Sequence, residues 1–246
     1  MKQRLADYVA DFLVDHGIVD CFMVTGGGAM HLNDALGHKD GLHCTYNHHE
    51  QGCAIAAEAY SRVNNKMAAL CVTTGPGGTN AITGVVGGWL DSVPMFVISG
   101  QVRYDTTARY MQQFSDGLSF RAVGDQEFDI TKSVSNMCKY AAMIEDPMQI
   151  RYALEKGYHL AMTGRRGPSW IDIPVNFQGC IIETDDLKGY DPKENEDHNS
   201  EAYKKHEGGC FVEWGDVKLE ADAPHTFTTV IKVADGMACN NVNWTL

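Results

Sequence analysis

The chain has 246 residues and a formal net charge of −12 at pH 7. That length can bury a sizeable core, and the acidic balance with scattered Lys and Arg excludes a footprint for a polyanion, so we expect no nucleic-acid partner. No apolar run could cross a bilayer, and acidic residues in the first segment argue against a signal or transit peptide. The eight cysteines form no CxxC pair, which favours reduced thiols in a cytoplasmic protein.

The predicted elements alternate between helix and strand. Apolar side chains from Leu5 to Leu13 recur with helical spacing, which predicts an opening helix with one buried face. A later helix spans Asp146–Met162, where Asp146 can cap it and Pro147 suits its first turn. Six short apolar runs have the character of strands covered on both faces: Cys21–Val24, Leu42–Tyr46, Ala68–Thr73, Met95–Ser99, Tyr140–Ile144 and Ser169–Ile173. The pattern predicts an α/β fold with a mostly parallel six-stranded sheet and helices on both faces.

The composition changes after Gly179. Residues 183–201 hold eight acidic side chains against two lysines, which is typical of an exposed linker. The following stretch is weakly patterned and contains no glycine-punctuated βαβ unit. We therefore expect a domain over residues 1–182, an acidic linker over 183–205, and an irregular tail over 206–246 that could be a truncated central domain.

Three turns follow successive predicted strands: Thr25–Gly28, Asn47–Gln51 and Thr74–Gly78. Because the carboxyl ends of parallel strands meet at one edge of a sheet, we expect these turns to form one site. The first turn lacks the spacing and acidic residue of a dinucleotide site, and the third lacks the Lys of a phosphate-binding P-loop. What remains is a pocket where backbone can approach a flat ring, with the carboxylate of Glu50 beside it.

Five separated segments then carry a more specific pattern: Val24–Leu36, Asn47–Tyr60, Thr73–Thr83, Trp89–Val102 and Gly164–Pro174. In this order they resemble the pyrimidine-binding domain of thiamine diphosphate enzymes of the acetolactate synthase type. The resemblance covers about residues 1–182. It implies thiamine diphosphate as cofactor and part of a 2-oxoacid decarboxylase or carboligase, a transferase or lyase, as the function.

The resemblance also implies roles for individual residues. In the family, the glutamate of the His-Glu-Gln motif bonds a ring nitrogen of the aminopyrimidine and drives it to the imino tautomer, whose exocyclic nitrogen takes the thiazolium C2 proton. This catalytic role falls on Glu50. The substrate side would be formed by Gln101 and His49. The pyrimidine ring would be lined by small residues of the turns: Gly27, Thr74, Gly75 and Gly77.

Each of these assignments has a structural alternative. A glutamate that opens a helix often only complements the helix dipole. His49, like His48, could simply begin the helix, and Gln101 at the end of a strand could make a structural hydrogen bond. Gly75 and Gly77 could serve the turn alone.

Two departures narrow what the resemblance implies. Asp125 stands where acetolactate synthases usually have a phenylalanine bordering the pyruvate site, which suits other acceptors such as nucleotide-sugar ketones. The diphosphate-binding half with its Mg²⁺ ligands is missing, and Asp235–Asn241 has too short a spacing to replace it. We therefore expect neither a metal site nor an FAD site on this chain.

Three hypotheses remain open. The chain could be an enzyme half that acts on a small 2-oxoacid and works as a homo-oligomer or with a separate diphosphate-domain chain that holds Mg²⁺. It could be a truncated product of a longer enzyme, or a non-catalytic interaction protein that keeps the fold. The intact motif around Glu50 argues against the last of these. In each case we expect no activity from the chain alone.

Overall fold

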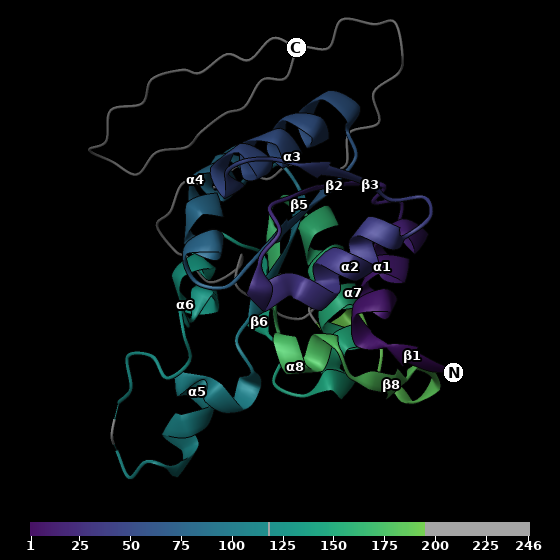
Figure 1. The fold of residues 1–246 in the computed structure, drawn as a ribbon. Coiled ribbons are helices and arrows are strands. Elements are labelled where there is room, and N and C mark those ends of the chain that lie inside the picture. The colour runs from purple at the N-terminus through teal and green to yellow at the C-terminus, as the bar shows by residue number, and fades with distance from the viewer. Residues whose placement is uncertain (118, 195–246) are drawn as a thin grey trace, which may run out of the picture. The chain divides into compact units, whose positions relative to one another are not determined.

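The computed structural model describes residues 1–117 and 119–194 (Figure 1). They form an α/β fold around a six-stranded sheet of order β3-β2-β4-β5-β7-β6, in which every neighbouring pair is parallel. The strands are β2 (Asp20–Met23), β3 (His43–Tyr46), β4 (Ala68–Val72), β5 (Met95–Gln101), β6 (Tyr140–Met143) and β7 (Ser169–Pro174). All six predicted strands are present, which confirms the predicted fold class.

Helices cover both faces of the sheet (Figure 1). One core cluster joins the sheet to α1 (Leu5–Asp15), α2 (Met30–His38) and α7 (Ile150–Met162). The other joins it to α3 (Glu50–Asn64), α4 (Pro76–Leu90) and α6 (Ile130–Val134). Alternate residues of β4 divide between the clusters: Leu70 packs toward α3 and α4, whereas Cys71 packs on the opposite face. This burial on both faces explains the nearly continuous apolar runs of the strands.

Two of the helices, α1 and α7, were predicted from the sequence pattern. In α1 the predicted stripe is buried, with Leu5, Val9 and Leu13 fully enclosed. Before α7 the Asp146 carboxylate accepts a hydrogen bond of 3.0 Å from the Met148 N–H, and Pro147 opens a 3₁₀ turn that leads into the helix. Both features confirm the predicted helices and their capping.

Short elements complete the described part of the chain. The two-stranded antiparallel pair β1 (Lys2–Arg4) and β8 (Ile181–Glu183) was not predicted from the sequence. The N-terminal amino group forms ion pairs with Glu183 and Asp185 beside it. The remaining elements are η1 (Gly27–Ala29), η2 (Tyr104–Thr106), α5 (Ala108–Met111), η3 (Gln112–Phe114), η4 (Pro147–Gln149), α8 (Val175–Gln178) and η5 (Thr184–Asp186).

The compact unit that contains the sheet runs from Met1 to Pro192. The first residues of the expected acidic linker end β8 and form η5. Residues 195–205 of that linker, the 206–246 tail and Asp235–Asn241 lie outside the described residues, so the division into domains stays a prediction. Within residues 1–117 and 119–194, no helix combines the length and the apolar character needed to cross a membrane.

Helices α3 and α4 lie very close together because small residues face each other. A Cβ atom added at Gly84 of α4 would lie 2.6 Å from the Ala54 Cβ and 2.8 Å from the backbone of Ala54 and Ile55 in α3. At Gly87, one turn later, the added atom would instead meet the carboxylate oxygens of Glu58 at 3.0 and 3.1 Å. The first contact is with backbone that cannot move alone, whereas the second is with the end of a flexible side chain.

This difference predicts opposite effects for two alanine substitutions. Gly84→Ala should lower the free energy of unfolding by about 1–3 kcal/mol, the usual cost of overpacking. Gly87→Ala should be neutral or stabilising by up to about 1 kcal/mol, since alanine favours the helix and Glu58 can turn away. Urea denaturation of both variants measures the difference. Equal effects at the two positions would contradict the close approach of α3 and α4.

Candidate functional site

The three turns meet at the carboxyl edge of the sheet, as predicted. Strands β3, β2 and β4 are adjacent and parallel, so the turns that follow them are neighbours. The Gly28 N–H donates a hydrogen bond of 3.1 Å to the Thr73 hydroxyl, which ties the first turn to the third. Glu50 opens α3 directly after the β3 turn. This edge of a parallel sheet is where open α/β folds bind ligands.

Glycines allow close contacts between these turns and the end of β5. A Cβ atom at Gly28 would lie 2.0 Å from the Thr74 hydroxyl oxygen, and one at Gly100 would lie 2.1 Å from the Gly28 carbonyl oxygen. Neither position has room for a side chain. The Thr74 hydroxyl donates to the Gly100 carbonyl at 3.1 Å, so its side chain is used inside the protein. The proton of this hydroxyl is therefore not available to a bound ring.

The third turn has a backbone conformation at position 75 that glycine adopts easily and other residues do not. Gly75 has φ of +57°, the left-handed region that glycine adopts without steric cost. A Cβ atom there would also lie 2.1 Å from the carbonyl oxygen of Gln126. Two independent reasons thus require glycine, and the second shows that a distant segment of the chain closes over this turn.

Glu50 is buried, with 9% of its surface exposed. The Asn80 side-chain amide of α4 donates a hydrogen bond of 3.0 Å to Glu50 Oε2. Glu50 Oε1 lies 3.4 Å from the position that a Cβ of Gly77 would take, so the absence of that side chain leaves room beside the carboxylate. Among the described residues Asn80 is the one side chain that hydrogen-bonds Glu50. The carboxylate is thus held at one oxygen and accessible at the other.

His49 and Gly27, two further predicted site residues, are both exposed. His49 is exposed and caps α3, because its Nδ1 accepts a hydrogen bond of 3.1 Å from the Gln51 N–H. The cap of the helix is therefore supplied by His49, although Glu50 still complements the helix dipole. Gly27 is exposed, with no atom within 4 Å of its added Cβ, so the space above it is open. The substrate-side role of His49 stays a prediction.

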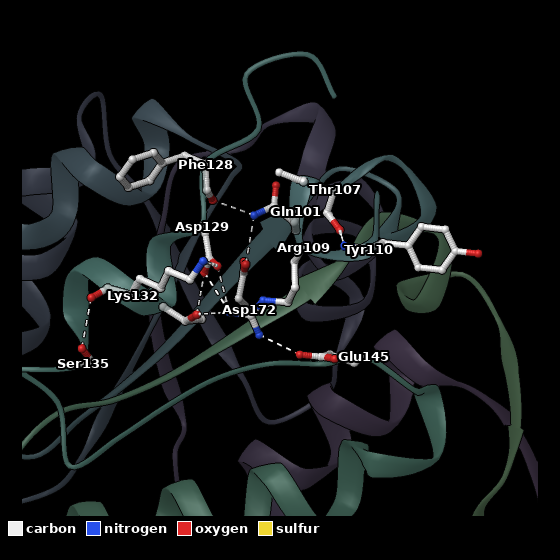
Figure 2. A network of polar contacts seen from close by, with 12 residues as sticks. Gln101, Thr107, Arg109, Tyr110, Phe128, Asp129, Lys132, Ser135, Glu145 and Asp172 are labelled. Atoms are coloured by element: carbon white, nitrogen blue, oxygen red, sulfur yellow. Dashed lines mark hydrogen bonds and ion pairs between the residues drawn. The ribbon is translucent and has the colours of Figure 1, made fainter. Parts of the chain in front are cut away.

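Gln101 is fully engaged inside the protein. Its amide nitrogen donates to the Phe128 carbonyl at 2.9 Å and to Asp172 Oδ2 at 3.0 Å, and its carbonyl accepts from the Val102 N–H at 2.9 Å (Figure 2). These bonds favour the structural alternative stated for this residue. Its contact with a substrate stays a prediction.

A buried polar network continues from Gln101. Asp172 lies in β7, is completely buried, and also accepts a hydrogen bond of 2.6 Å from the Ser99 hydroxyl. Burial raises the pKa of Asp172 to about 7, although the hydrogen bonds from Ser99 and Gln101 oppose the shift. Arg109 lies near this carboxyl and binds Asp129 at 2.9 Å and Glu145 at 2.8 Å (Figure 2). The carboxyl edge thus carries a second group of charges beside the three turns.

Sequence reasoning missed several residues that shape the site. Asn80 gives little sign of its role, since it follows Gly77 by one helical turn and meets Glu50 only when α3 and α4 pack together. Gln126 reaches the Gly75 turn through its carbonyl oxygen, which any residue type could supply. Asp172 did leave a sign, because it is the one acidic residue in the otherwise apolar run Ser169–Ile173. Buried acids in strands are rare unless their oxygens are hydrogen-bonded.

A metal site is not formed by the part of the chain that the structure describes. Among residues 1–117 and 119–194, no group of three or more His, Cys, Asp or Glu side chains could hold a metal ion.

The sequence of the chain is similar to a known protein family and to individual enzymes. Residues 3–120 match the family described as thiamine pyrophosphate enzyme, N-terminal TPP binding domain. The acetolactate synthase large subunit of Lactococcus lactis subsp. lactis is 33% identical over 196 residues, which cover 80% of this chain and 31% of that protein. The large subunit of Haemophilus influenzae is 34% identical over 169 residues, covering 69% and 27%. The chloroplastic acetolactate synthase of Arabidopsis thaliana is 31% identical over 176 residues, covering 70% and 24%.

The chain therefore carries the N-terminal thiamine pyrophosphate-binding domain of the acetolactate synthase-like enzymes. This confirms the resemblance that the five sequence segments carry. The aligned part of the chain spans between 24% and 31% of the length of the three relatives named above.

The raised pKa of Asp172 predicts a pH-dependent stability. The folded chain holds this proton up to about pH 7, whereas the unfolded chain releases it near the ordinary value of 3.8. Stability should therefore decrease as pH rises between these two values. Asp172→Asn does not titrate, and its amide can still serve Ser99 and Gln101. From pH 5 to pH 8 its unfolding free energy should gain about 2–3 kcal/mol relative to wild type.

Urea denaturation at several pH values measures this difference, and Asp105→Asn is the control. A hydrogen bond from Arg103 lowers the pKa of Asp105, so its titration falls below pH 5. The Asp105 variant should thus differ from wild type by a constant amount over the range. A constant difference for Asp172→Asn as well would show that this carboxyl is not held protonated.

Proposed function

We propose that the chain is the pyrimidine-binding half of a thiamine diphosphate-dependent 2-oxoacid decarboxylase or carboligase in which Glu50 activates the cofactor. The observation that carries this proposal is the state of the Glu50 carboxylate at the carboxyl edge of the sheet. It is buried, held at one oxygen by Asn80, and accessible at the other beside Gly77. A carboxyl group in this position can share a proton with a ring nitrogen.

The surrounding residues fit an aminopyrimidine. The ring is flat, and the site offers open space over Gly27 together with the turn at Gly75 and Gly77. Asn80 fixes the orientation of the Glu50 carboxylate, so that the free oxygen faces the space left by Gly77. When bound, thiamine diphosphate supplies a thiazolium carbon that stabilises the carbanion left by decarboxylation. The protein's part is to hold the ring, exclude water and move the proton through Glu50.

The diphosphate must be held elsewhere. Its charge needs a metal ion and a helix N-terminus, and the described residues provide no metal ligand set. We therefore propose that a diphosphate domain from another chain supplies Mg²⁺ and closes the site, and that FAD has no place on this chain. Relatives named acetolactate synthase support a small 2-oxoacid as substrate. Asp125 in place of a phenylalanine favours a different acceptor, such as a nucleotide-sugar ketone.

The outer surfaces of α3 and α4 support an assembly. Large apolar side chains are exposed on both helices: Ile55 (45%), Val63 (83%) and Leu90 (64%). Glu50 begins α3, so a partner on this surface would lie next to the site and could keep water from it. We propose that this surface pairs with a second copy or with a diphosphate-domain chain. Buried free thiols at Cys21, Cys71 and Cys138 support a reducing, cytoplasmic location.

A substitution that introduces one charge on this surface tests the proposed assembly. Ile55→Asp should weaken self-association in sedimentation, because a carboxylate would be buried against an apolar partner. Ile181→Asp is the control, since Ile181 of β8 is also exposed (64%) but lies away from these helices. A wild-type chain that stays monomeric at high concentration, with no gain on adding a diphosphate-domain chain, would contradict the proposed assembly.

The cofactor role can be tested by reconstitution. The purified chain alone should bind thiamine diphosphate weakly and should not turn over pyruvate or other 2-oxoacids. A diphosphate-domain chain should restore Mg²⁺-dependent binding and decarboxylation. In that complex Glu50→Gln should lower kcat by at least about 100-fold, the lower range for losing a general acid or base, while assembly stays intact. Calorimetry and steady-state kinetics measure both effects.

Glu58→Gln is the matched control for this substitution. Glu58 lies on the same helix but pairs with Arg62, so its loss should leave binding and kcat unchanged. Full activity of the Glu50 variant would remove this residue from the mechanism. Robust activity of the chain alone would reveal a diphosphate site within it. Failure of every diphosphate-domain chain to restore binding would favour the alternatives, a truncated product or a non-catalytic interaction protein.

A further inference from the structure

A long segment leaves the sheet after β5 and returns to it before α6. It spans residues 102–129 and carries the short helix α5, which Figure 1 shows standing away from the sheet. Its last part, Gly124–Phe128, comes back to the carboxyl edge, where the carbonyl of Gln126 lies against the Gly75 turn. The returning segment is therefore a wall of the candidate site, and it has little regular structure of its own.

One anchor of this wall is the pair Asp172 and Gln101. The Gln101 amide nitrogen bonds the Phe128 carbonyl and Asp172 together, while its oxygen accepts from Val102. These three bonds fix the amide in a single orientation, because exchanging its oxygen and nitrogen would break all of them. Asp172 supplies the acceptor that holds the nitrogen end through Oδ2, whereas the Ser99 hydroxyl donates to the other oxygen, Oδ1.

A second anchor is Glu127, which lies within the returning segment. Its carboxylate is buried and accepts hydrogen bonds from two backbone N–H groups of the long segment, Ala108 at 2.7 Å and Val123 at 2.6 Å. Glu127 thus joins two parts of the 102–129 segment, at Ala108 and at Val123, to each other. Gln101 joins the same segment to the sheet. Among the described residues, Gln101 supplies the one hydrogen bond between Gly124–Phe128 and a strand of the sheet.

We propose that Asp172 and Gln101 are positioning residues that hold Gly124–Phe128 against the Gly75 turn and so place Asp125 and Gln126 at the site. This proposal rests on the proposed function for what the wall encloses, but the anchoring itself does not depend on it. The carboxyl of Asp172 acts through Gln101 and the Phe128 carbonyl. Gln126, with φ of 57°, is held in a conformation that a loose segment would leave.

Hydrogen exchange of the full chain, followed by mass spectrometry of peptides over residues 123–130, tests the anchoring. The Glu127 and Ile130 amides are hydrogen-bonded within the segment and report its opening. Gln101→Leu and Asp172→Leu should each speed their exchange roughly tenfold, the factor for losing one hydrogen bond of typical net strength. Asp172→Asn keeps an acceptor for Gln101 and should restore protection to nearly the wild-type level.

Ser99→Ala is the matched control. It removes a different hydrogen bond to Asp172, and one from Trp170, but leaves the contact between Gln101 and Phe128. It should therefore leave exchange at residues 123–130 unchanged. If the Leu variants fail to fold, the isosteric Gln101→Glu replaces the donor with an acceptor and should loosen the segment equally. Unchanged exchange in the Gln101 variants, or equal loosening in Ser99→Ala and across β4, would overturn the proposal.

The affinity for thiamine diphosphate tests separately whether the wall belongs to the site. In a complex with a diphosphate-domain chain, Asp172→Leu should raise the Kd for thiamine diphosphate several-fold, whereas Ser99→Ala should not. An unchanged Kd in Asp172→Leu would remove the wall from the site. If the wild-type complex binds no thiamine diphosphate, the proposed function fails, and the exchange result still decides whether Asp172 and Gln101 anchor the segment.

Discussion

The close approach of backbones at the carboxyl edge of the sheet is the constraint on which the site depends. Gly28 lies between the Thr74 hydroxyl and the backbone at Gly100, with no room for a side chain on either glycine. These contacts join the turn after β2 to the turn after β4 and to the end of β5. In the turn after β4, Gly75 adopts a left-handed conformation against the carbonyl of Gln126. The arrangement of the turns consequently depends on glycine at each of these contacts.

The position of Glu50 follows from the same close packing. Small residues let α3 and α4 approach until Asn80 of one helix reaches the carboxylate at the start of the other. One oxygen is thereby satisfied while the other stays beside Gly77, and a buried carboxylate with an accessible oxygen is suited to proton transfer. The assembly surface that we propose on the two helices would lie next to this group. Helix packing, the proposed assembly and the proposed proton transfer would therefore involve the same pair of helices.

The sequence predicted features that depend on local pattern. The six strands, the α1 stripe and the Asp146 cap each show within a few residues, and the order of motifs led to the family. The three-residue strands β1 and β8 were missed because they are too short to show a period. The partner of Glu50 and the bonds from the Gln101 amide nitrogen also stayed hidden, since each joins residues that are 27 or more positions apart. Such contacts exist only once the helices and loops have packed.

Exchange of the C2 proton of thiamine diphosphate with deuterium tests the role of Glu50 most directly. Proton NMR can follow it in a complex of this chain with a diphosphate-domain chain and Mg²⁺, without any substrate. If Glu50 drives the proton transfer, the wild-type complex should exchange this proton far faster than the free cofactor does. The complex with Glu50→Gln should bind the cofactor but exchange at close to the free rate. Equally fast exchange in both complexes would contradict activation by Glu50.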